Sequence, residues 1–430
     1  MVSQLTHANF HLPPNSETLL PPAQPETHTF LSLIEKALDH PLDMPPLAQW
    51  DLRFKTVALL IDDWGRPTPC HTFLPAIIQR LLNAGIQPQD ITIITASGMH
   101  DPMSEADLKR KVGPDIYMHY RCISHDAGDA NMLRFVGVTN LGTPVWVNRY
   151  AADADIRLSF GRVFPHVAYG YEGGYKMIVP GIASFETILR DHSLNFSPFS
   201  TYASVISNPS RNEADAIGRM VGIDMMVGFV IDWDNRPVSA FAGTVERAFA
   251  ASISYGQHYV WGALSSRLSD ITILCAREES RQLLSQNPTY YLGTALNVTK
   301  ADGIIIASMD YHEPEKVIVQ GINMHEIPME QLYRYHECRN WTLCARDVQH
   351  AMKAIRGAFY YRRIYELCSQ TLFFCSDTYP SRIIEKWKAQ KFDSVQKALD
   401  AALRLKGPNA SVNYIPDGAH TLPLTHYDFS

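Results

Sequence analysis

The stretch "TVALLIDDWGRPTPCHTFLPAIIQRLLNAG", residues 56–85, decides the fold class of this chain. It opens with a continuous apolar run that contains β-branched residues, and such a run predicts a buried strand of a parallel sheet over 56–62. The remainder, from 71 to 85, has apolar residues at helical spacing and stops at a glycine, as helices commonly do. A buried strand followed by a helix is typical of an α/β fold.

The alternation of strand and helix continues along the chain. Residues 91–96, "ITIITA", predict a second strand, and the helix that follows is expected to have Ser104 as its N-cap. A second α/β unit is predicted to open around 265–275 and to continue through 301–310 and 371–380, a helix at 394–407 and a strand at 410–415. We therefore predict an α/β protein with two α/β domains, 1–270 and 271–430, mostly parallel sheets, and the active site in the cleft between the domains.

Composition and charge narrow the kinds of partner. The chain has 430 residues, 46% of them hydrophobic and 19% charged, which is typical of a globular protein. A net charge of −6 without a Lys/Arg cluster argues against nucleic acid or an anionic membrane as partner. The seven cysteines include no CxxC pair, which suits a reducing compartment. Without a signal-peptide pattern or an apolar run near the roughly 20 residues that span a bilayer, we expect a cytoplasmic protein that binds a small molecule.

Polar side chains follow the first two predicted strands. Because the carboxyl ends of parallel strands meet at one edge of a sheet, the loops after these strands should lie side by side. They carry Asp63, Arg66 and His100. The guanidinium of Arg66 suits a carboxylate or phosphate, and the alternative is a structural ion pair with Asp62 or Asp63. His100 is an acid–base candidate because an unperturbed imidazole titrates near neutral pH, and the alternative is a solvated loop histidine.

A glycine-rich stretch, "HVAYGYEGGYKMIVPGIAS" (166–184), follows a further predicted strand at 156–160. Its glycines would weaken a helix or strand, which indicates that something approaches the backbone closely. Lys176 would be partly desolvated there, which lowers the pKa of a lysine and favours covalent chemistry through a neutral amine. The alternative is a lysine that reaches water. His166 and His192 are each open to three interpretations: a metal ligand, a base or a packing residue.

Common nucleotide-binding motifs are missing from the sequence. "GYEGGYK" lacks the spacing of a Walker loop, and no GxGxxG pattern follows the first strand, so neither ATP nor ordinary NAD binding is indicated. A mononucleotide remains compatible with these residues. Its phosphate would accept N–H groups from the turn at Pro180–Gly181.

Five segments of the chain together resemble the lactate racemase family, whose enzymes use a nickel-pincer nucleotide. The segments are "IDDWGRPTPCHTFLPAII" (61–78), "ITIITASGMHDPMSEADL" (91–108), "HVAYGYEGGYKMIVPGIASFETILRDH" (166–192), "NPSRNEADAIGRMVGID" (208–224) and "VQKALDAALRLKGPNASVNYIPDGAHTLPL" (395–424). They occur in the family's order and cover most of the chain. The resemblance makes the first domain the cofactor-binding and catalytic domain and the second the substrate-side domain.

The resemblance implies a role for each candidate residue. In the family, a lysine at the position of Lys176 is joined to the cofactor, a pyridinium mononucleotide whose thioamide and thiocarboxylate groups hold nickel. The other implied assignments are His192 as the nickel ligand, His100 and His166 as acid–base residues, Arg66 as the substrate-contacting arginine, and Asp63, Gly174, Pro180 and Gly181 as further cofactor-binding residues.

The resemblance also implies a reaction. A hydride moves from C2 of a 2-hydroxy acid to the pyridinium ring, a planar 2-keto acid forms, and return of the hydride to the other face gives the epimer. Two histidines on opposite sides serve as the bases for the hydroxyl proton, while the arginine holds the carboxylate. The implied transient partners are the enzymes that build the cofactor: a carboxylase/hydrolase, a sulfur transferase and a nickel insertase. Assembly into a homo-oligomer is left open.

The chain departs from the family's pattern at residues that are expected to contact the substrate. The first motif reads Trp64-Gly65-Arg66, whereas the family commonly has a threonine before the arginine, so Trp64 changes the wall beside the substrate. In the second domain, Gln349 and Lys353 are the candidate substrate contacts, and solvated helix residues are the alternative. The polar side chains of that helix favour a sugar acid such as gluconate, epimerised at C2.

Other functions are compatible with the same residues. A lactate or malate racemase would use the same mechanism on a smaller acid. A protein of the same fold could bind the nucleotide without turnover. A zinc hydrolase would instead use His100, His166 and His192.

Overall fold

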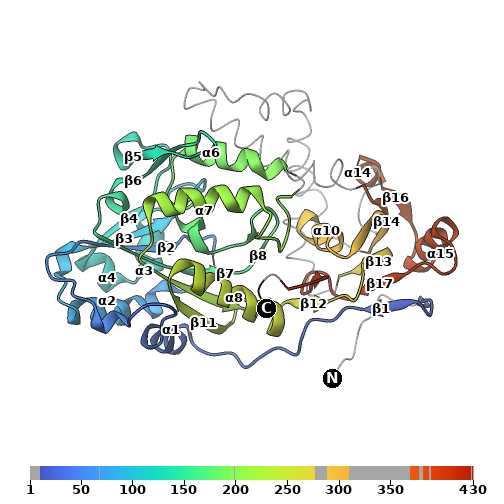
Figure 1. Cartoon of the computed structure of the whole chain (residues 1–430), viewed down its shortest axis with the longest axis horizontal. Helices are drawn as coiled ribbons and strands as arrows, with labels where there is room; N and C mark the ends of the chain where they lie inside the picture. Colours follow the sequence, from blue (N-terminus) through green and yellow to red (C-terminus); the bar gives the residue numbers. More distant parts are fainter. Residues whose placement is uncertain are drawn as a thin grey trace.

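The computed structural model describes residues 10–66, 68–197, 199–276, 288–308, 369–376, 381–386, 389–427 and 429. Its two six-stranded sheets, with helices packed on them, confirm the predicted α/β class with mostly parallel strands. Figure 1 shows the first sheet in the blue-to-green part of the chain and the second mainly in the yellow-to-red part. No helix within the described ranges is long and apolar enough to cross a membrane.

The first sheet has the strand order β11–β10–β7–β2–β3–β4, and β11 alone of these runs antiparallel to its neighbour. Its strands are β2 (Val57–Asp62), β3 (Ile91–Ala96), β4 (Arg121–Ser124), β7 (Ile156–Val163), β10 (Met225–Ile231) and β11 (Pro237–Gly243). Every residue of β2 is buried, and alternate residues contribute to two different apolar cores. Both faces of the strand are therefore covered, which explains its continuously apolar sequence.

Helices supply the other side of these two cores. They are α1 (Phe30–Asp39), α2 (Leu74–Asn83), α3 (Glu105–Val112), α4 (Pro114–His119), α5 (Arg149–Ala152), α6 (Phe185–Ser193), α7 (Pro209–Val221) and α8 (Val245–Tyr259). The predicted N-cap of α3 is confirmed, because the hydroxyl oxygen of Ser104 accepts the backbone N–H of Asp107 at 3.2 Å. Short 3₁₀ helices are η1 (Leu47–Gln49), η2 (Cys70–Thr72), η3 (Pro88–Asp90), η4 (Ala130–Met132), η5 (Gly174–Met177) and η6 (Leu194–Phe196).

Small two-stranded sheets connect the larger elements. They are β5 (Leu133–Val138) with β6 (Pro144–Asn148), β8 (Pro165–His166) with β9 (Gly170–Tyr171), and β12 (Gly262–Leu264) with β18 (Leu422–Leu424). The β8–β9 pair lies within the glycine-rich stretch, directly after β7.

The second sheet has the order β1–β17–β13–β14–β15–β16, with every pair parallel. Its elements are β1 (Ser16–Thr18), β13 (Ser269–Cys275), β14 (Thr299–Ser308), β15 (Thr371–Cys375), β16 (Gln390–Phe392) and β17 (Val412–Ile415), with helices α10 (Pro288–Leu296), α14 (Ser381–Lys386) and α15 (Val395–Lys406). The N-terminal segment supplies the edge strand β1, seen in blue beside β17 in Figure 1. A strand of three residues is too short to give a periodic signal in the sequence, so β1 was not predicted.

The two sheets approach each other at the carboxyl ends of their strands. Trp233, just after β10, packs edge-on against His420, which follows β17, with ring centroids 5.9 Å apart. Trp233 in turn packs on Phe164, which follows β7, with ring centroids 5.0 Å apart. The loops that carry the candidate site residues begin at this same edge of the first sheet.

Candidate active site

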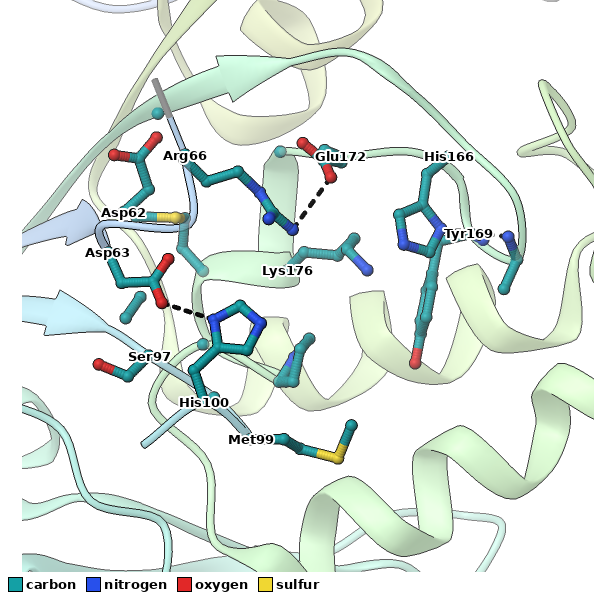
Figure 2. A pocket seen from close by; sticks show the side chains of 18 of the residues that line it. Asp62, Asp63, Arg66, Ser97, Met99, His100, His166, Tyr169, Glu172 and Lys176 are labelled. Carbon is teal, nitrogen blue, oxygen red and sulfur yellow. Dashed lines mark hydrogen bonds and ion pairs between the residues drawn. The ribbon is translucent and has the colours of Figure 1, made fainter. Parts of the chain in front are cut away.

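A cavity of about 190 Å³ lies at the carboxyl ends of β2, β3 and β7 (Figure 2). The predicted residues that line it are Asp63, Arg66, His100, His166, Lys176, Pro180, Gly181 and His192. The loops after β2 and β3 therefore meet as a parallel sheet predicts. The third loop, after β7, reaches the same cavity.

Two other predicted residues, Trp64 and Gly174, lie in the described part of the chain but do not line the cavity. Trp64 is 65% exposed, and its ring centroid lies 6.4 Å from that of His100, so it is a rim residue. Gly174 is buried outside the cavity lining, at a positive φ of 64° that favours glycine. Gln349 and Lys353 lie outside the described residues.

His100 is oriented by a buried carboxylate. Its Nδ1 lies 2.5 Å from Oδ2 of Asp63, and the other carboxylate oxygen accepts the backbone N–H of Gly65 at 3.2 Å. Figure 2 shows the second ring nitrogen of His100 facing the cavity. A carboxylate at Nδ1 fixes the ring and its tautomer, which leaves a lone pair on Nε2. This arrangement suits a general base.

A buried lysine that the sequence did not single out supports the loop beneath this pair. Nζ of Lys111, on α3, donates to Oδ1 of Asp62 at 2.9 Å. It also donates to the backbone carbonyl oxygens of Asp63 at 2.9 Å and Thr68 at 2.8 Å. The Thr68 hydroxyl donates to the second carboxylate oxygen of Asp62 at 2.6 Å. The ammonium group of Lys111 therefore holds the loop after β2 in place, and this loop carries Asp63 and Arg66.

Arg66 is held by a second buried carboxylate. Its Nη2 lies 3.0 Å from Oε1 of Glu172, while Nε of Arg162 lies 2.5 Å from Oε2. Burial alone would raise the pKa of Glu172, but the guanidiniums of Arg162 and Arg66 together hold that pKa well below its usual range. Figure 2 shows the Arg66 side chain extended across the cavity toward Glu172. The two arginines and one carboxylate leave net positive charge on this wall, which suits a carboxylate ligand.

His166 has a different environment from His100. Its Nδ1 accepts hydrogen bonds from the backbone N–H groups of Ala168 at 3.1 Å and Tyr169 at 3.2 Å. Burial, followed by the charge of Lys176, lowers the pKa of His166 well below its usual value. The imidazole is therefore neutral at physiological pH.

Lys176 lies on η5 with its amine inside the cavity. Nζ sits over the ring of Tyr169, 3.5 Å from the ring centroid. Burial, followed by the charge of Arg211, lowers the pKa of Lys176 to about 7. The predicted desolvation of this lysine is confirmed, and a large fraction of its amine is neutral and nucleophilic near pH 7.

His192, at the end of α6, is anchored through Nδ1. This nitrogen lies 3.0 Å from Oδ2 of Asp191 and 2.8 Å from the hydroxyl of Tyr169, which also donates to Asp191. A histidine held in this way presents Nε2 to a ligand, and carboxylates commonly orient metal-binding histidines so. Among the residues that the structure describes, Oδ1 of Asp191 is buried without a hydrogen-bond partner. The site therefore retains unused acceptor capacity beside His192.

The loop around Lys176 is fixed by a buried arginine on α7. Arg211 donates to the backbone carbonyl oxygens of Tyr169, Tyr171 and Gly173. It also pairs with Asp215 one turn later at 3.4 Å. A guanidinium has five N–H donors in a fixed fork, so one side chain can hold three carbonyl groups of an irregular loop. Arg211 therefore determines the backbone path on which the cavity depends.

Residues 5–202 match the family model described as "Lactate racemase N-terminal domain". This N-terminal part of the chain is similar to the N-terminal domain of lactate racemases. Two curated lactate racemases are similar to the chain: that of Lactiplantibacillus plantarum, 29% identical over 217 residues, and that of Thermoanaerobacterium thermosaccharolyticum, 26% identical over 218 residues. Each match covers 50% of this chain and 51% of the relative, so it spans about half of each protein's length.

Solved structures extend the likeness to the whole lactate racemase fold. The lactate racemase apoprotein from Thermoanaerobacterium thermosaccharolyticum superposes with a TM-score of 0.72 at 20% identity, covering 96% of both chains. A protein from Thermotoga maritima superposes with a TM-score of 0.54 at 17% identity, covering 87% of this chain and 94% of that one. At these identities the likeness shows the fold, including the strands of the second sheet that lie beyond the residues of the family model.

The sequence analysis missed the residues that hold this site in place. Glu172 and Tyr169 stand in the glycine-rich stretch but were not assigned roles. Asp191 stands directly before His192, and Arg211 stands in the family-like segment 208–224, in which no residue was assigned a role. Sequence reasoning could have flagged Tyr169, Glu172 and Asp191 as charged or aromatic residues close to candidates, but nothing in the sequence marks Arg211, and only the fold shows which atoms they contact.

The cofactor-free amine of Lys176 should react with acetic anhydride at a rate that is half-maximal near pH 7, because its pKa is about 7 and only the neutral amine is nucleophilic. The reacting fraction rises with pH, since deprotonation exposes the lone pair. Mass spectrometry of acetylated peptides measures this rate. The exposed Lys109 is the internal control. A half-point for Lys176 equal to that of Lys109 would contradict the assignment.

Arg211→Met should lower the free energy of unfolding by about 3–5 kcal/mol, because it leaves three carbonyl groups and a partly buried carboxylate without their donor. Urea denaturation followed by tryptophan fluorescence measures the change. Arg219→Met is the matched control on the same helix, since Arg219 is half exposed and pairs with the exposed Glu246. That variant should stay within about 0.5 kcal/mol of the parent. Equal losses in both variants would remove the scaffold role of Arg211.

Proposed function

We propose that the chain is a racemase of 2-hydroxy acids and that lactate is its substrate. The observation that carries the proposal is the convergence, in one cavity, of a carboxylate-oriented histidine, a carboxylate-held arginine and a lysine amine with a pKa of about 7. The names of the relatives favour lactate over the sugar acid that the polar helix suggested. The predicted helix with Gln349 and Lys353 falls on residues that the structure does not describe.

The residues present fit a nickel-pincer nucleotide attached at Lys176. Amide-type linkage requires a neutral amine, which burial provides. His192 would hold the nickel, because its Nδ1 is anchored and the adjacent Asp191 has an unused buried oxygen. Pro180 and Gly181 line the same cavity and would face the nucleotide. When bound, this group would accept a hydride from C2 and return it.

The chain's own side chains would orient the acid and move its proton. Arg66 would bind the carboxylate, with Glu172 fixing the direction of the guanidinium. His100 would take the hydroxyl proton at Nε2, and Asp63 would stabilise the resulting imidazolium through Nδ1. In the view of Figure 2, the side chain of Lys176 lies between those of His100 and His166, and all three residues line the same cavity.

The proposal also concerns partners and location. A cofactor of this kind would be supplied by separate enzymes that meet the folded chain transiently, and their presence would place the protein in the cytoplasm. Cell fractionation together with cross-linking to the loading enzymes tests both statements. Recovery of the chain outside the cytoplasm would refute the location.

The direct test is an assay of the chain purified after co-expression with the cofactor-producing enzymes. Each enantiomer of lactate and malate, and gluconate, is supplied separately, and chiral chromatography follows the product. We expect interconversion of the lactate enantiomers. Activity on gluconate alone would move the substrate to sugar acids, and a loaded protein inactive on every acid would favour the non-catalytic nucleotide-binding alternative. Among the described residues, no group of three His, Cys, Asp or Glu side chains is placed to hold a metal ion, so the zinc-hydrolase alternative receives no support from the geometry.

A further inference from the structure

Tyr169 is a buried side chain to which the proposed reaction gives no role. It lines the same cavity as Lys176 and His192 and is 1% exposed. Nζ of Lys176 lies 3.5 Å from the centroid of its ring, and its hydroxyl oxygen lies 2.8 Å from Nδ1 of His192. Figure 2 shows the amine of Lys176 directed at this ring. One side chain therefore contacts both residues that are proposed to hold the nickel-pincer nucleotide.

The hydroxyl end of Tyr169 belongs to a triangle of three polar atoms. The other two are Oδ2 of Asp191, to which the hydroxyl donates, and Nδ1 of His192, which lies 3.0 Å from that oxygen. A carboxylate only accepts hydrogen bonds, so hydrogens from both the tyrosine and the imidazole are needed. With the imidazole hydrogen on Nε2, Nδ1 would face the carboxylate oxygen with a lone pair, at a site where water is scarce. The geometry therefore places the hydrogen on Nδ1 and leaves Nε2 with the lone pair that a metal ion uses.

The ring end of Tyr169 limits where the amine of Lys176 can lie. A lysine has a flexible four-carbon stem, and its amine ordinarily reaches water. Here the amine rests against the ring face, and the ring itself packs edge-on against His166, with centroids 5.4 Å apart and an interplanar angle of 69°. Holding a reacting group in one position removes much of the entropic cost of a reaction at that group.

The surrounding structure fixes Tyr169 before any ligand is bound. Its backbone carbonyl oxygen accepts a hydrogen bond from Nε of Arg211 at 3.2 Å, and its backbone N–H donates to Nδ1 of His166 at 3.2 Å. The partner of its hydroxyl, Asp191, is fully buried on α6. A side chain held at both its backbone and its tip can orient the groups that contact it.

We infer that Tyr169 is the positioning residue of this site: its hydroxyl, with Asp191, fixes His192 with Nε2 free for a metal ion, and its ring face fixes the amine of Lys176. The inference rests on the proposed function. It also separates the two ends of the side chain, because Tyr169→Phe removes only the hydroxyl whereas Tyr169→Leu removes the ring as well.

Tyr171 supplies matched controls for both substitutions. It is fully buried and lies two positions along the chain, but it does not line the cavity. Its hydroxyl accepts a hydrogen bond from Gln257 at 2.6 Å, so Tyr171→Phe also removes a buried hydroxyl from its partner. Melting temperatures of each pair of variants measure the loss of stability that the substitutions share.

The contact with His192 is tested in the full cofactor-free chain, labelled with ¹⁵N-histidine. Long-range proton–nitrogen correlation spectra distinguish protonated from unprotonated ring nitrogens, and a His192→Asn spectrum assigns the residue among 17 histidines. We expect Nδ1–H and a free Nε2 at His192. In Tyr169→Phe, but not in Tyr171→Phe, the Nδ1 hydrogen should exchange with water about tenfold faster. Nε2–H at His192 in the parent, or an unchanged exchange rate in Tyr169→Phe, would overturn the inference.

Protein co-expressed with the cofactor-producing enzymes tests both ends of the side chain. Intact mass measures attachment, and the loss of nickel to EDTA measures how firmly the metal is held. Tyr169→Phe should carry the nucleotide like the parent but release nickel about 10–100-fold faster, the usual effect of removing a partner of a metal-binding histidine. Tyr169→Leu should also lower the attached fraction about tenfold, whereas Tyr171→Leu should not.

The outcomes separate the inference from the proposed function. Parental nickel release in Tyr169→Phe, or parental attachment in Tyr169→Leu, would show that Tyr169 does not position these groups. Equal losses in the Tyr171 variants would show that the effect is one of general stability and that the inference is wrong. A parent protein without added mass on Lys176 would refute the proposed function, while the spectra of the cofactor-free chain would still decide how His192 is held.

Discussion

Asp63→Asn is expected to lower kcat for lactate racemisation by about 10³–10⁴-fold, the size of effect seen when a carboxylate that orients a catalytic histidine becomes an amide. The side chain would keep its shape, but its amide N–H would face Nδ1 of His100. The ring hydrogen would then move to Nε2, and the lone pair that accepts the hydroxyl proton would be lost. Steady-state assays with either enantiomer measure the loss.

The matched control for that variant is Asp101→Asn, an exposed neighbour of His100 in the same loop. It should keep the parent's kcat, because its carboxylate is solvated. KM should change little in Asp63→Asn, since Arg66 still binds the acid's carboxylate. A variant with parental kcat, or one that loses activity only because its melting temperature falls, would show that the Asp63–His100 contact is structural.

Lys176→Arg is expected to abolish racemisation entirely and to prevent attachment of the nucleotide. A guanidinium stays protonated at any physiological pH and cannot supply the neutral amine that the linkage needs. Intact-mass spectrometry and activity assays on protein from the same co-expression measure both effects. Lys109→Arg, on the exposed face of α3, should be loaded and active like the parent. A loaded or active Lys176→Arg protein would disprove attachment at this position.

Local pattern was enough to predict the elements that carry the site. The apolar run of β2 reflects burial on both faces, and the N-cap of α3 is a contact between residues three apart, so both are visible in sequence. The rule that parallel strands end at one edge brought Asp63, Arg66 and His100 together correctly. The strand β1 was missed because its partner, β17, is almost 400 positions away along the 430-residue chain.

The supporting contacts could not be predicted for the same reason. Lys111 reaches Asp62 from a helix 49 positions later, and Arg211 reaches Tyr171 across 40 positions. Neither residue type nor sequence spacing distinguishes a buried lysine or arginine of this kind from the solvated lysines and arginines that are common on helices. The state of His166 also depends on backbone N–H groups, which every residue but proline carries and no motif marks.

The central claim is that the amine of Lys176 carries a nickel-holding mononucleotide, and intact mass followed by peptide mapping of the co-expressed protein tests it most directly. The account predicts a mass excess equal to one modified mononucleotide, located on the peptide that contains Lys176. Active racemase whose Lys176 peptide has its unmodified mass, or whose added mass lies on another residue, would contradict it.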